Sequence, residues 1–235
     1  MAIPGKVLIT GANRGIGLAL VTVFLERGWH VFGCARQPQK CGAFKKLTSK
    51  YRSLFTVIKL DVTNERSIAQ AAVSVSRKTK HLDILINNAG VCFKEKAIYR
   101  FDSVHAARAF AVNATGPMLM TKHFLRLIKK SLSPKIVNIS SLSGSISRVS
   151  GFSGFYTYKA SKAALNMFSR LLAYELRDFG ITTLILHPGL VKTRMNSGAK
   201  MLPLESASKI FNIINDNELQ DTGSFLSTDL NTCPW

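Results

Sequence analysis

A glycine-rich turn between a short apolar strand and a helix-length apolar stretch is the feature that most constrains this chain. The turn is Thr10–Gly17, Thr-Gly-Ala-Asn-Arg-Gly-Ile-Gly, and it follows the apolar run Lys6–Thr10. Gly11 permits a sharp turn, whereas Gly15 and Gly17 lack side chains where a diphosphate would approach and where the helix packs on the strand. The free N–H groups of the helix N-terminus attract phosphate. The pattern favours dinucleotide binding, with a purely structural turn as the alternative.

Short apolar segments alternate with helical segments along the rest of the chain. The expected strands are His30–Ala35, Leu54–Leu60, Ile84–Ile86, Ile136–Ile139, Ile181–Leu186 and Ser224–Leu226. The expected helices are Lys40–Lys50, Thr63–Lys80, a continuous helix from Asp102 to Lys130, Tyr158–Asp178 and Ser206–Ile214. Leu142–Phe155 is too rich in Ser and Gly for an element of its own. Because the strands lack polar alternation, they indicate an α/β fold, a doubly wound parallel sheet, in a single domain over residues 1–235.

The chain is strongly basic, with 32 Lys and Arg against 13 Asp and Glu and a formal net charge of +19. Such a charge is compatible with a nucleic acid, an acidic membrane or anionic small ligands as the partner. The basic residues are spread along the chain without an aromatic-interleaved basic motif, so we predict neither a nucleic-acid nor a membrane partner. The segment from Arg27 to Leu60 holds eight Lys or Arg residues and no acid.

The cysteines and the N-terminus indicate a cytoplasmic protein. Cys34, Cys41, Cys92 and Cys233 show neither C-x-x-C spacing nor a paired His, which predicts free thiols and no metal site. Met1–Gly5 leads directly into the first strand and leaves no room for a signal peptide. No apolar run approaches the roughly 20 residues of a membrane span.

A tyrosine and a lysine in the longest expected helix form a candidate acid–base pair. Tyr158 and Lys162 lie four residues apart, so their side chains share a helix face. A nearby ammonium favours phenolate and lowers a tyrosine pKa, which suits proton exchange with a substrate oxygen. Tyr156 competes for this role, but Ala160 stands four residues beyond it. The alternative is an exposed helix pair without chemistry.

Polar residues also stand where other elements end or bend. Ser140 and Ser141 follow a buried strand, where a hydroxyl can bind an oxyanion or satisfy the backbone. No G-x-S-x-G motif surrounds them, which argues against a hydrolase. Asn113 is unfavourable inside a helix and indicates either an interior hydrogen bond or a plain irregularity. His187 precedes a proline, and we interpret it as structural.

Together these stretches resemble the short-chain dehydrogenase/reductase family, whose members have the Rossmann fold. Thr10–Gly17 matches its T-G-x-x-x-G-x-G, Asn87–Gly90 its N-N-A-G, and Tyr158–Lys162 its Y-x-x-x-K. Pro188-Gly189 matches the P-G of the family, and the motifs follow in order across nearly the whole chain. The segment between Ser141 and Tyr158 and the Gly223–Leu226 ending are most similar to the sniffer-type and C-factor-like carbonyl reductases.

The resemblance implies a catalytic tetrad of Asn113, Ser141, Tyr158 and Lys162. Tyr158 would protonate the substrate oxygen, which Ser141 would orient. Lys162 would lower the pKa of Tyr158 and hold the nicotinamide ribose, and Asn113 would support a water that relays protons to Lys162. The resemblance also implies a mobile substrate lid over about residues 190–209 and a homodimer or homotetramer.

The implied cofactor contacts span the chain. They are Gly11, Asn13, Arg14, Gly15, Ile16, Gly17, Arg36, Asp61, Val62, Asn88, Ala89, Gly90, Tyr158, Lys162, Pro188, Gly189, Val191 and Thr193. NAD-binding versions of this fold place an acid about 20 residues past the glycines. Here Arg36 occupies that region, and Arg36 with Arg14 suits a 2′-phosphate, which predicts NADPH rather than NADH.

The sequence therefore predicts an NADPH-dependent carbonyl reductase acting on a small carbonyl compound. Three alternatives stay open. They are an NAD-linked alcohol dehydrogenase on the same fold, a non-catalytic dinucleotide-binding protein that acts through partners, and a nucleic-acid binder suggested only by net charge.

Overall fold

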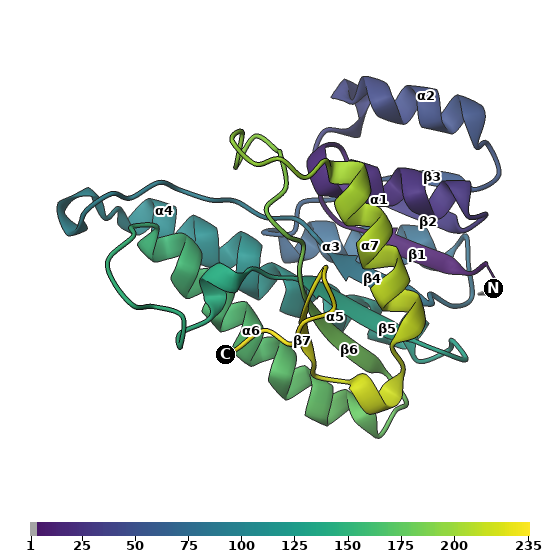
Figure 1. The fold of residues 1–235 in the computed structure, drawn as a ribbon. Helices are drawn as coiled ribbons and strands as arrows, with labels where there is room; N and C mark the ends of the chain where they lie inside the picture. The colour runs from purple at the N-terminus through teal and green to yellow at the C-terminus, as the bar shows by residue number, and fades with distance from the viewer. Residues whose placement is uncertain (1–3) are drawn as a thin grey trace.

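A parallel sheet of seven strands forms the centre of the computed structural model, which describes residues 4–235 (Figure 1). The strands are β1 (Lys6–Ile9), β2 (His30–Ala35), β3 (Phe55–Lys59), β4 (Ile84–Asn87), β5 (Lys135–Ile139), β6 (Thr182–His187) and β7 (Phe225–Ser227). They lie in the order β3-β2-β1-β4-β5-β6-β7. The order reverses between β1 and β4, which in such sheets is where ligands bind. Residues 1–3 of the expected lead-in Met1–Gly5 lie outside the described residues.

Both faces of the sheet are buried, as the apolar strands predict. Successive side chains of a strand point to opposite faces. Val7 and Ile9 therefore join one hydrophobic cluster with Phe24 and Ile210, and Leu8 joins the other with Phe124. Because neither face contacts water, the strands need no polar alternation.

Helices cover the two faces of the sheet (Figure 1). The first face carries α1 (Gly15–Glu26), α2 (Gly42–Lys50) and α7 (Pro203–Asp216), and the second carries α3 (Glu65–Ser76), α5 (Gly116–Ile128) and α6 (Tyr156–Arg177). A further helix, α4 (Ser103–Phe110), precedes α5 and packs against α6. None of the helices within residues 4–235 combines the length and the apolar character needed to cross a membrane.

The structure confirms the parallel α/β sheet and changes some element bounds. The helix expected to run unbroken from Asp102 to Lys130 contains a π-helical turn at Ala111–Thr115, so it consists of α4, this turn and α5. Such turns insert one extra residue and often mark functional sites. A 3₁₀ turn forms at Leu142–Gly144, where no element was expected. Helix α6 begins at Tyr156, two residues before its expected start.

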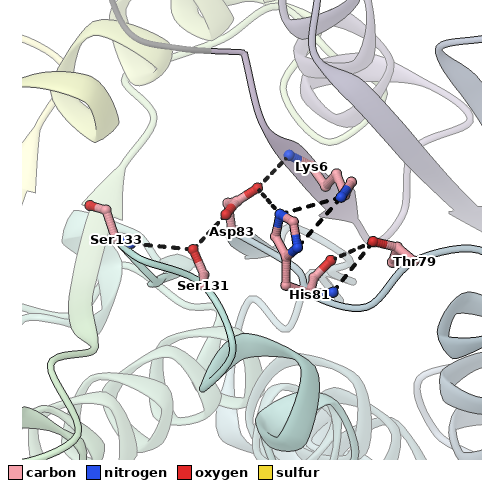
Figure 2. A network of polar contacts seen from close by, with 6 residues as sticks. All are labelled: Lys6, Thr79, His81, Asp83, Ser131 and Ser133. Atoms are coloured by element: carbon pink, nitrogen blue, oxygen red, sulfur yellow. Dashed lines mark hydrogen bonds and ion pairs between the residues drawn. The ribbon is translucent and has the colours of Figure 1, made fainter.

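A polar network ties the amino-terminal ends of the strands together, away from the ligand edge (Figure 2). The Asp83 carboxylate accepts hydrogen bonds from Lys6 N–H at 2.7 Å and from the Ser131 hydroxyl at 2.5 Å. His81 Nε2 lies 3.6 Å from the same carboxylate. Lys6 opens β1, and Ser131 lies in the loop between α5 and β5. Asp83 therefore joins the amino-terminal ends of β1 and β5, the two strands that flank β4.

We expect Asp83→Ala to lower the free energy of unfolding by about 2–4 kcal/mol. The change leaves the Lys6 N–H and the Ser131 hydroxyl without their acceptor, and both groups are partly buried, so each costs up to about 1–3 kcal/mol. Urea denaturation measures the loss. Ser133→Ala is the control, because residue 133 enters the network through its backbone N–H. Equal unfolding free energies for Asp83→Ala and Ser133→Ala would contradict this account.

Candidate active site

A cleft of about 450 Å³ lies at the carboxyl ends of the central strands. Most of the expected site residues line it: Gly11, Asn13, Arg14, Gly15, Ile16, Gly17, Arg36, Asp61, Val62, Asn88, Ala89, Gly90, Tyr158, Lys162, Pro188 and Thr193. These residues come from segments far apart in the sequence. The parallel sheet brings them together because the carboxyl ends of its strands share one edge.

The glycine turn forms one wall of the cleft and is held by the residues after β4. The Thr10 hydroxyl accepts hydrogen bonds from the N–H groups of Asn88 and Ala89, both at 3.0 Å. The Asn88 side-chain amide donates to Thr10 O at 2.8 Å. A Cβ at Gly17 would lie 2.3 Å from Gly11 O, so the close packing of α1 on the turn requires glycine there.

The N-terminus of α1 is open toward the cleft. Arg14 stands at the N-cap, and no side chain caps the helix. The first N–H groups of a helix have no intrahelical partner, and the helix dipole adds partial positive charge. Gly15 has φ +53°, and the nearest atoms to a Cβ there would belong to Thr193 at 3.5 Å. This wall therefore fits a diphosphate that approaches the backbone closely.

A second hollow of about 740 Å³ continues the cleft beyond Arg14 and Arg36. Five basic side chains and one carboxylate line it: Arg14, Arg36, Lys40, Lys59, Arg66 and Asp61. Burial alone would raise the pKa of Asp61, but hydrogen bonds from Thr63 and the nearby charges of Arg36 and Arg108 lower it overall. This end of the site consequently attracts a compact anion.

Tyr158 and Lys162 stand at the opposite end of the cleft, on one face of α6. Burial raises the pKa of Tyr158, which a hydrogen bond with Ser141 partly offsets. Burial lowers the pKa of Lys162 to about 8. The Lys162 ammonium donates to Ile139 O at 2.7 Å and lies 6.0 Å from the centre of the Tyr158 ring.

That Lys162 lowers the pKa of Tyr158 stays a prediction beside these contacts. Loss of hydration at Tyr158 outweighs the other influences on the phenol, and the ammonium of Lys162 points to the end of β5 instead. Tyr158 consequently stays protonated at neutral pH. A protonated phenol in a cleft is a proton donor.

The structure distinguishes the two serines at the end of β5. Ser140 is buried, and its hydroxyl donates to Asn166 Oδ1 at 2.5 Å. The Ser141 hydroxyl accepts a hydrogen bond from Ser143 N–H at 3.1 Å and forms a hydrogen bond with the phenol of Tyr158. Ser141 is therefore the serine beside Tyr158, although the cleft lining itself includes Ser140.

The 3₁₀ turn that follows Ser141 is fixed from two sides. Leu142 N–H donates to His187 Nδ1 at 3.4 Å, and burial lowers the pKa of His187 to about 4. A Cβ at Gly144 would lie 2.7 Å from the backbone of Lys162. The turn packs directly on α6, and the neutral His187 has the structural role expected for it.

Asn113 lies in the π-helical turn and is fully buried, behind the cleft wall rather than in it. Its Oδ1 accepts from Val91 N–H, and its Nδ2 donates to Val91 O and to Ser161 Oγ, each at 2.9 Å. Both amide hydrogens are therefore used within the protein. The contacts show Asn113 joining the loop after β4 to α6. The water relay implied by the family resemblance stays a prediction.

Glu95 is a residue near the site that the sequence did not single out. It is buried, and its carboxylate accepts from Thr157 Oγ1 at 2.5 Å and from Thr157 N–H at 3.4 Å. Its carbonyl accepts from the N–H of Phe155, which has the left-handed φ of 62°. Glu95 thus fixes the first turn of α6, one residue before Tyr158. No motif marks it, because a loop carboxylate usually lies in solvent.

Other parts of the predicted site differ from the structure. Gly189 and Val191 lie outside the cleft lining, because Gly189 packs under Met201 and Val191 is buried in a bridge with Met201. Residues 203–209 of the expected lid belong to α7, which packs on α1, and a mobile lid over residues 190–202 stays a prediction. The cleft lining includes Ser140, which the sequence offered beside Ser141, and further residues that the predicted site did not contain: Ala35, Leu60, Val91, Arg108, Val112, Ile139, Lys192, Arg194, Met195 and Pro203.

The buried ammonium of Lys162 predicts a pH-dependent stability. Below pH 8 the lysine is protonated in the folded and unfolded states, so the folded state bears the cost of burying the charge. Between pH 8 and 10.5 the folded state has released this proton and the unfolded state has not, so the free energy of unfolding rises with pH. We expect the original chain to gain about 3 kcal/mol relative to Lys162→Met across this window. Urea denaturation of both proteins at several pH values tests this, and a constant difference would contradict it.

A Rossmann-like parallel sheet with this glycine turn and a Tyr-Lys pair on a long helix defines the class of protein. The family model described as short chain dehydrogenase matches residues 5–201. An oxidoreductase of Schizosaccharomyces pombe is 32% identical over 257 residues, with 100% of both chains covered. The chain belongs to the short-chain dehydrogenase family and is an oxidoreductase of that family.

Solved structures of carbonyl reductases are similar to this chain over nearly its whole length. The NADPH-bound carbonyl reductase from chicken fatty liver is 33% identical, with a TM-score of 0.94 and 100% of both chains covered. The carbonyl reductase Sniffer of D. melanogaster is 28% identical, also with a TM-score of 0.94, over 99% of this chain and 100% of that one. The resemblance noted from the motifs is thus confirmed.

Proposed function

We propose that this protein is an NADPH-dependent carbonyl reductase that uses Tyr158 as the proton donor. The observation that carries the proposal is the arrangement of one cleft, with a basic hollow at one end and Tyr158, Ser141 and Lys162 at the other. The similarity to carbonyl reductases supports the same activity.

The chain's own residues account for the proton transfer. The raised pKa keeps Tyr158 protonated at neutral pH, so its hydroxyl donates to the oxygen of a carbonyl substrate as negative charge develops there. The hydroxyl of Ser141, beside the phenol, donates a second hydrogen bond to that oxygen. When bound, NADPH supplies the hydride that the carbonyl carbon accepts. The product is an alcohol whose new O–H bond carries the proton of Tyr158.

The cofactor would lie along the whole cleft. The N-terminus of α1 with Gly15 would hold the diphosphate, and Arg14 and Arg36 would bind the 2′-phosphate. Asp61 and Val62 would contact the adenine. Lys162 would hold the nicotinamide ribose, and Thr193 would meet the carboxamide. Gly189 and Val191 would support this contact indirectly, because both pack beneath Met201.

The proposed activity predicts consumption of NADPH with a panel of aldehydes, ketones and quinones. NADPH absorbance measures turnover, and NADH serves as the parallel cofactor. Faster turnover with NAD and alcohols would instead support the alcohol dehydrogenase. Binding of NADPH without turnover on any member of the panel would support the non-catalytic dinucleotide-binding protein. Salt-resistant binding of DNA or RNA without turnover would support the nucleic-acid binder.

Assembly as a homodimer or homotetramer and a cytoplasmic location stay predictions. The exposed side chains of Met167, Leu171 and Tyr174 recur along one stripe of α6, which supports pairing of copies through this helix.

A further inference from the structure

Two loops beside the cleft expose a group of large apolar side chains. The first loop contributes Ile98, Tyr99 and Phe101, and the second contributes Ile146, Val149 and Phe152. Tyr99 is 81% exposed and Ile146 is 75% exposed, so most of the surface of these two side chains lies outside the protein core. A cluster of this kind on a protein surface marks an interaction site.

The two loops form one surface, which we call the entrance rim (residues 94–101 and 146–152). Tyr156 lies between them, with its ring centre 6.5 Å from that of Phe101 and 5.5 Å from that of Phe152. The hydrogen bond from Phe155 N–H to Glu95 O, at 2.8 Å, joins their bases. In Figure 1 both loops lie at the end of the molecule where α4 and α6 begin.

The entrance rim is also positively charged. Lys94, Lys96, Arg100 and Arg148 are exposed on it. The one acid within these two ranges is Glu95, which is buried against Thr157. Asp102, the next acid along the chain, caps α4 through His105 N–H. Apolar side chains surrounded by cations therefore project from a chain whose net charge is +19.

Although the spread of basic residues along the sequence predicted no membrane partner, we propose that the entrance rim docks the protein on an anionic lipid membrane. Aliphatic side chains such as Ile98, Ile146 and Val149 suit the acyl boundary of a bilayer, while the surrounding cations suit anionic headgroups. A second copy of the chain would bring the same cations against one another. Nucleic acid matches the cations, but it offers no hydrocarbon for the aliphatic side chains.

Docking in this orientation would place the cleft close to the bilayer. The first loop follows Val91 and the second follows Ser140, and both of these residues line the cleft. If the chain is the carbonyl reductase proposed above, the rim would let a lipid-soluble carbonyl compound pass from the membrane to Tyr158. The docking itself depends on the rim alone and is measured without turnover.

Co-sedimentation with vesicles tests the proposal. We expect the full chain to bind vesicles of phosphatidylcholine mixed with phosphatidylserine and to bind phosphatidylcholine vesicles far more weakly. The variant Ile98→Ser/Tyr99→Ser/Phe152→Ser and the variant Lys94→Gln/Lys96→Gln/Arg148→Gln should each bind the anionic vesicles at least about tenfold more weakly. Both variants change exposed side chains, so their unfolding midpoints should stay unchanged.

A matched variant distinguishes vesicle binding through the rim from general attraction by the net charge of the chain. Lys45→Gln/Lys46→Gln/Arg52→Gln removes the same charge from exposed positions on α2 and just after it, and it should bind the anionic vesicles nearly as the original chain does. If this variant and the rim variants lost binding to anionic vesicles equally, general charge attraction would explain the binding and the proposal would be overturned. Absence of vesicle binding would also overturn it, as would self-association or RNA binding that the apolar rim variant abolishes.

Discussion

Tyr158→Phe is expected to lower turnover of a carbonyl substrate by about 10²–10⁴-fold while NADPH still binds. The change keeps the aromatic ring and its packing against the cleft but removes the hydroxyl that donates the proton. Burial already keeps this phenol protonated, and Ser141 forms a hydrogen bond with it, whereas the Lys162 ammonium at the same end of the cleft donates to Ile139 O. Steady-state kinetics and NADPH titration measure the two effects separately.

Tyr156→Phe is the matched control. Tyr156 stands two residues earlier on α6, and its ring packs with Phe101 and Phe152 rather than lining the cleft. This variant should turn over nearly as fast as the original chain. An inactive Tyr156→Phe together with an active Tyr158→Phe would show that the assignment of the proton donor is wrong.

Replacing Arg14 and Arg36 together by Ala is expected to remove most of the preference for NADPH over NADH. We expect that preference to be about 2–4 kcal/mol, since charge-assisted hydrogen bonds contribute about 1.5–3 each before exposure is discounted. This corresponds to a ratio of dissociation constants of about 30–1,000. The double variant should lose affinity for NADPH and keep its affinity for NADH, as measured by titration with both cofactors.

Lys45→Ala is the control for the loss of general positive charge. Lys45 is exposed on α2 and lies outside both hollows of the site, so its removal should change the affinity for either cofactor little. An original chain that binds NADPH and NADH with equal affinity would refute the role of the basic hollow. Equal weakening of both cofactors in the double variant would place the two arginines at the diphosphate instead.

Local patterns in the sequence were enough to predict the sheet and most of the cleft. Strands such as His30–Ala35 are uninterrupted apolar runs because both faces of the sheet are buried. Because the strands are parallel, the polar residues at their carboxyl ends lie at one edge of the sheet. Gly17 is marked because its missing side chain is required at the contact with Gly11. Tyr158 and Lys162 are marked by helical spacing alone.

The features that the sequence did not determine depend on contacts between distant segments. Asn113 bonds to Val91 and Ser161, and Glu95 bonds to Thr157, so neither role can be seen from neighbouring residues. The raised pKa of Tyr158 depends on such contacts too, because spacing gives a shared helix face but not the loss of hydration that dominates at the phenol.

The basic residues of the chain also show which features the sequence determines and which depend on the tertiary structure. The sequence by itself determined the charge of +19, the parallel α/β sheet and the residues of the glycine turn. Only the tertiary structure added Lys40, Lys59 and Arg66 to the predicted pair of Arg14 and Arg36 around one hollow. It alone also grouped the cations of the entrance rim with exposed apolar side chains. The physical reason is that hydrophobic periodicity acts over a few residues, whereas solvent exclusion and electrostatic fields depend on every segment that folds nearby.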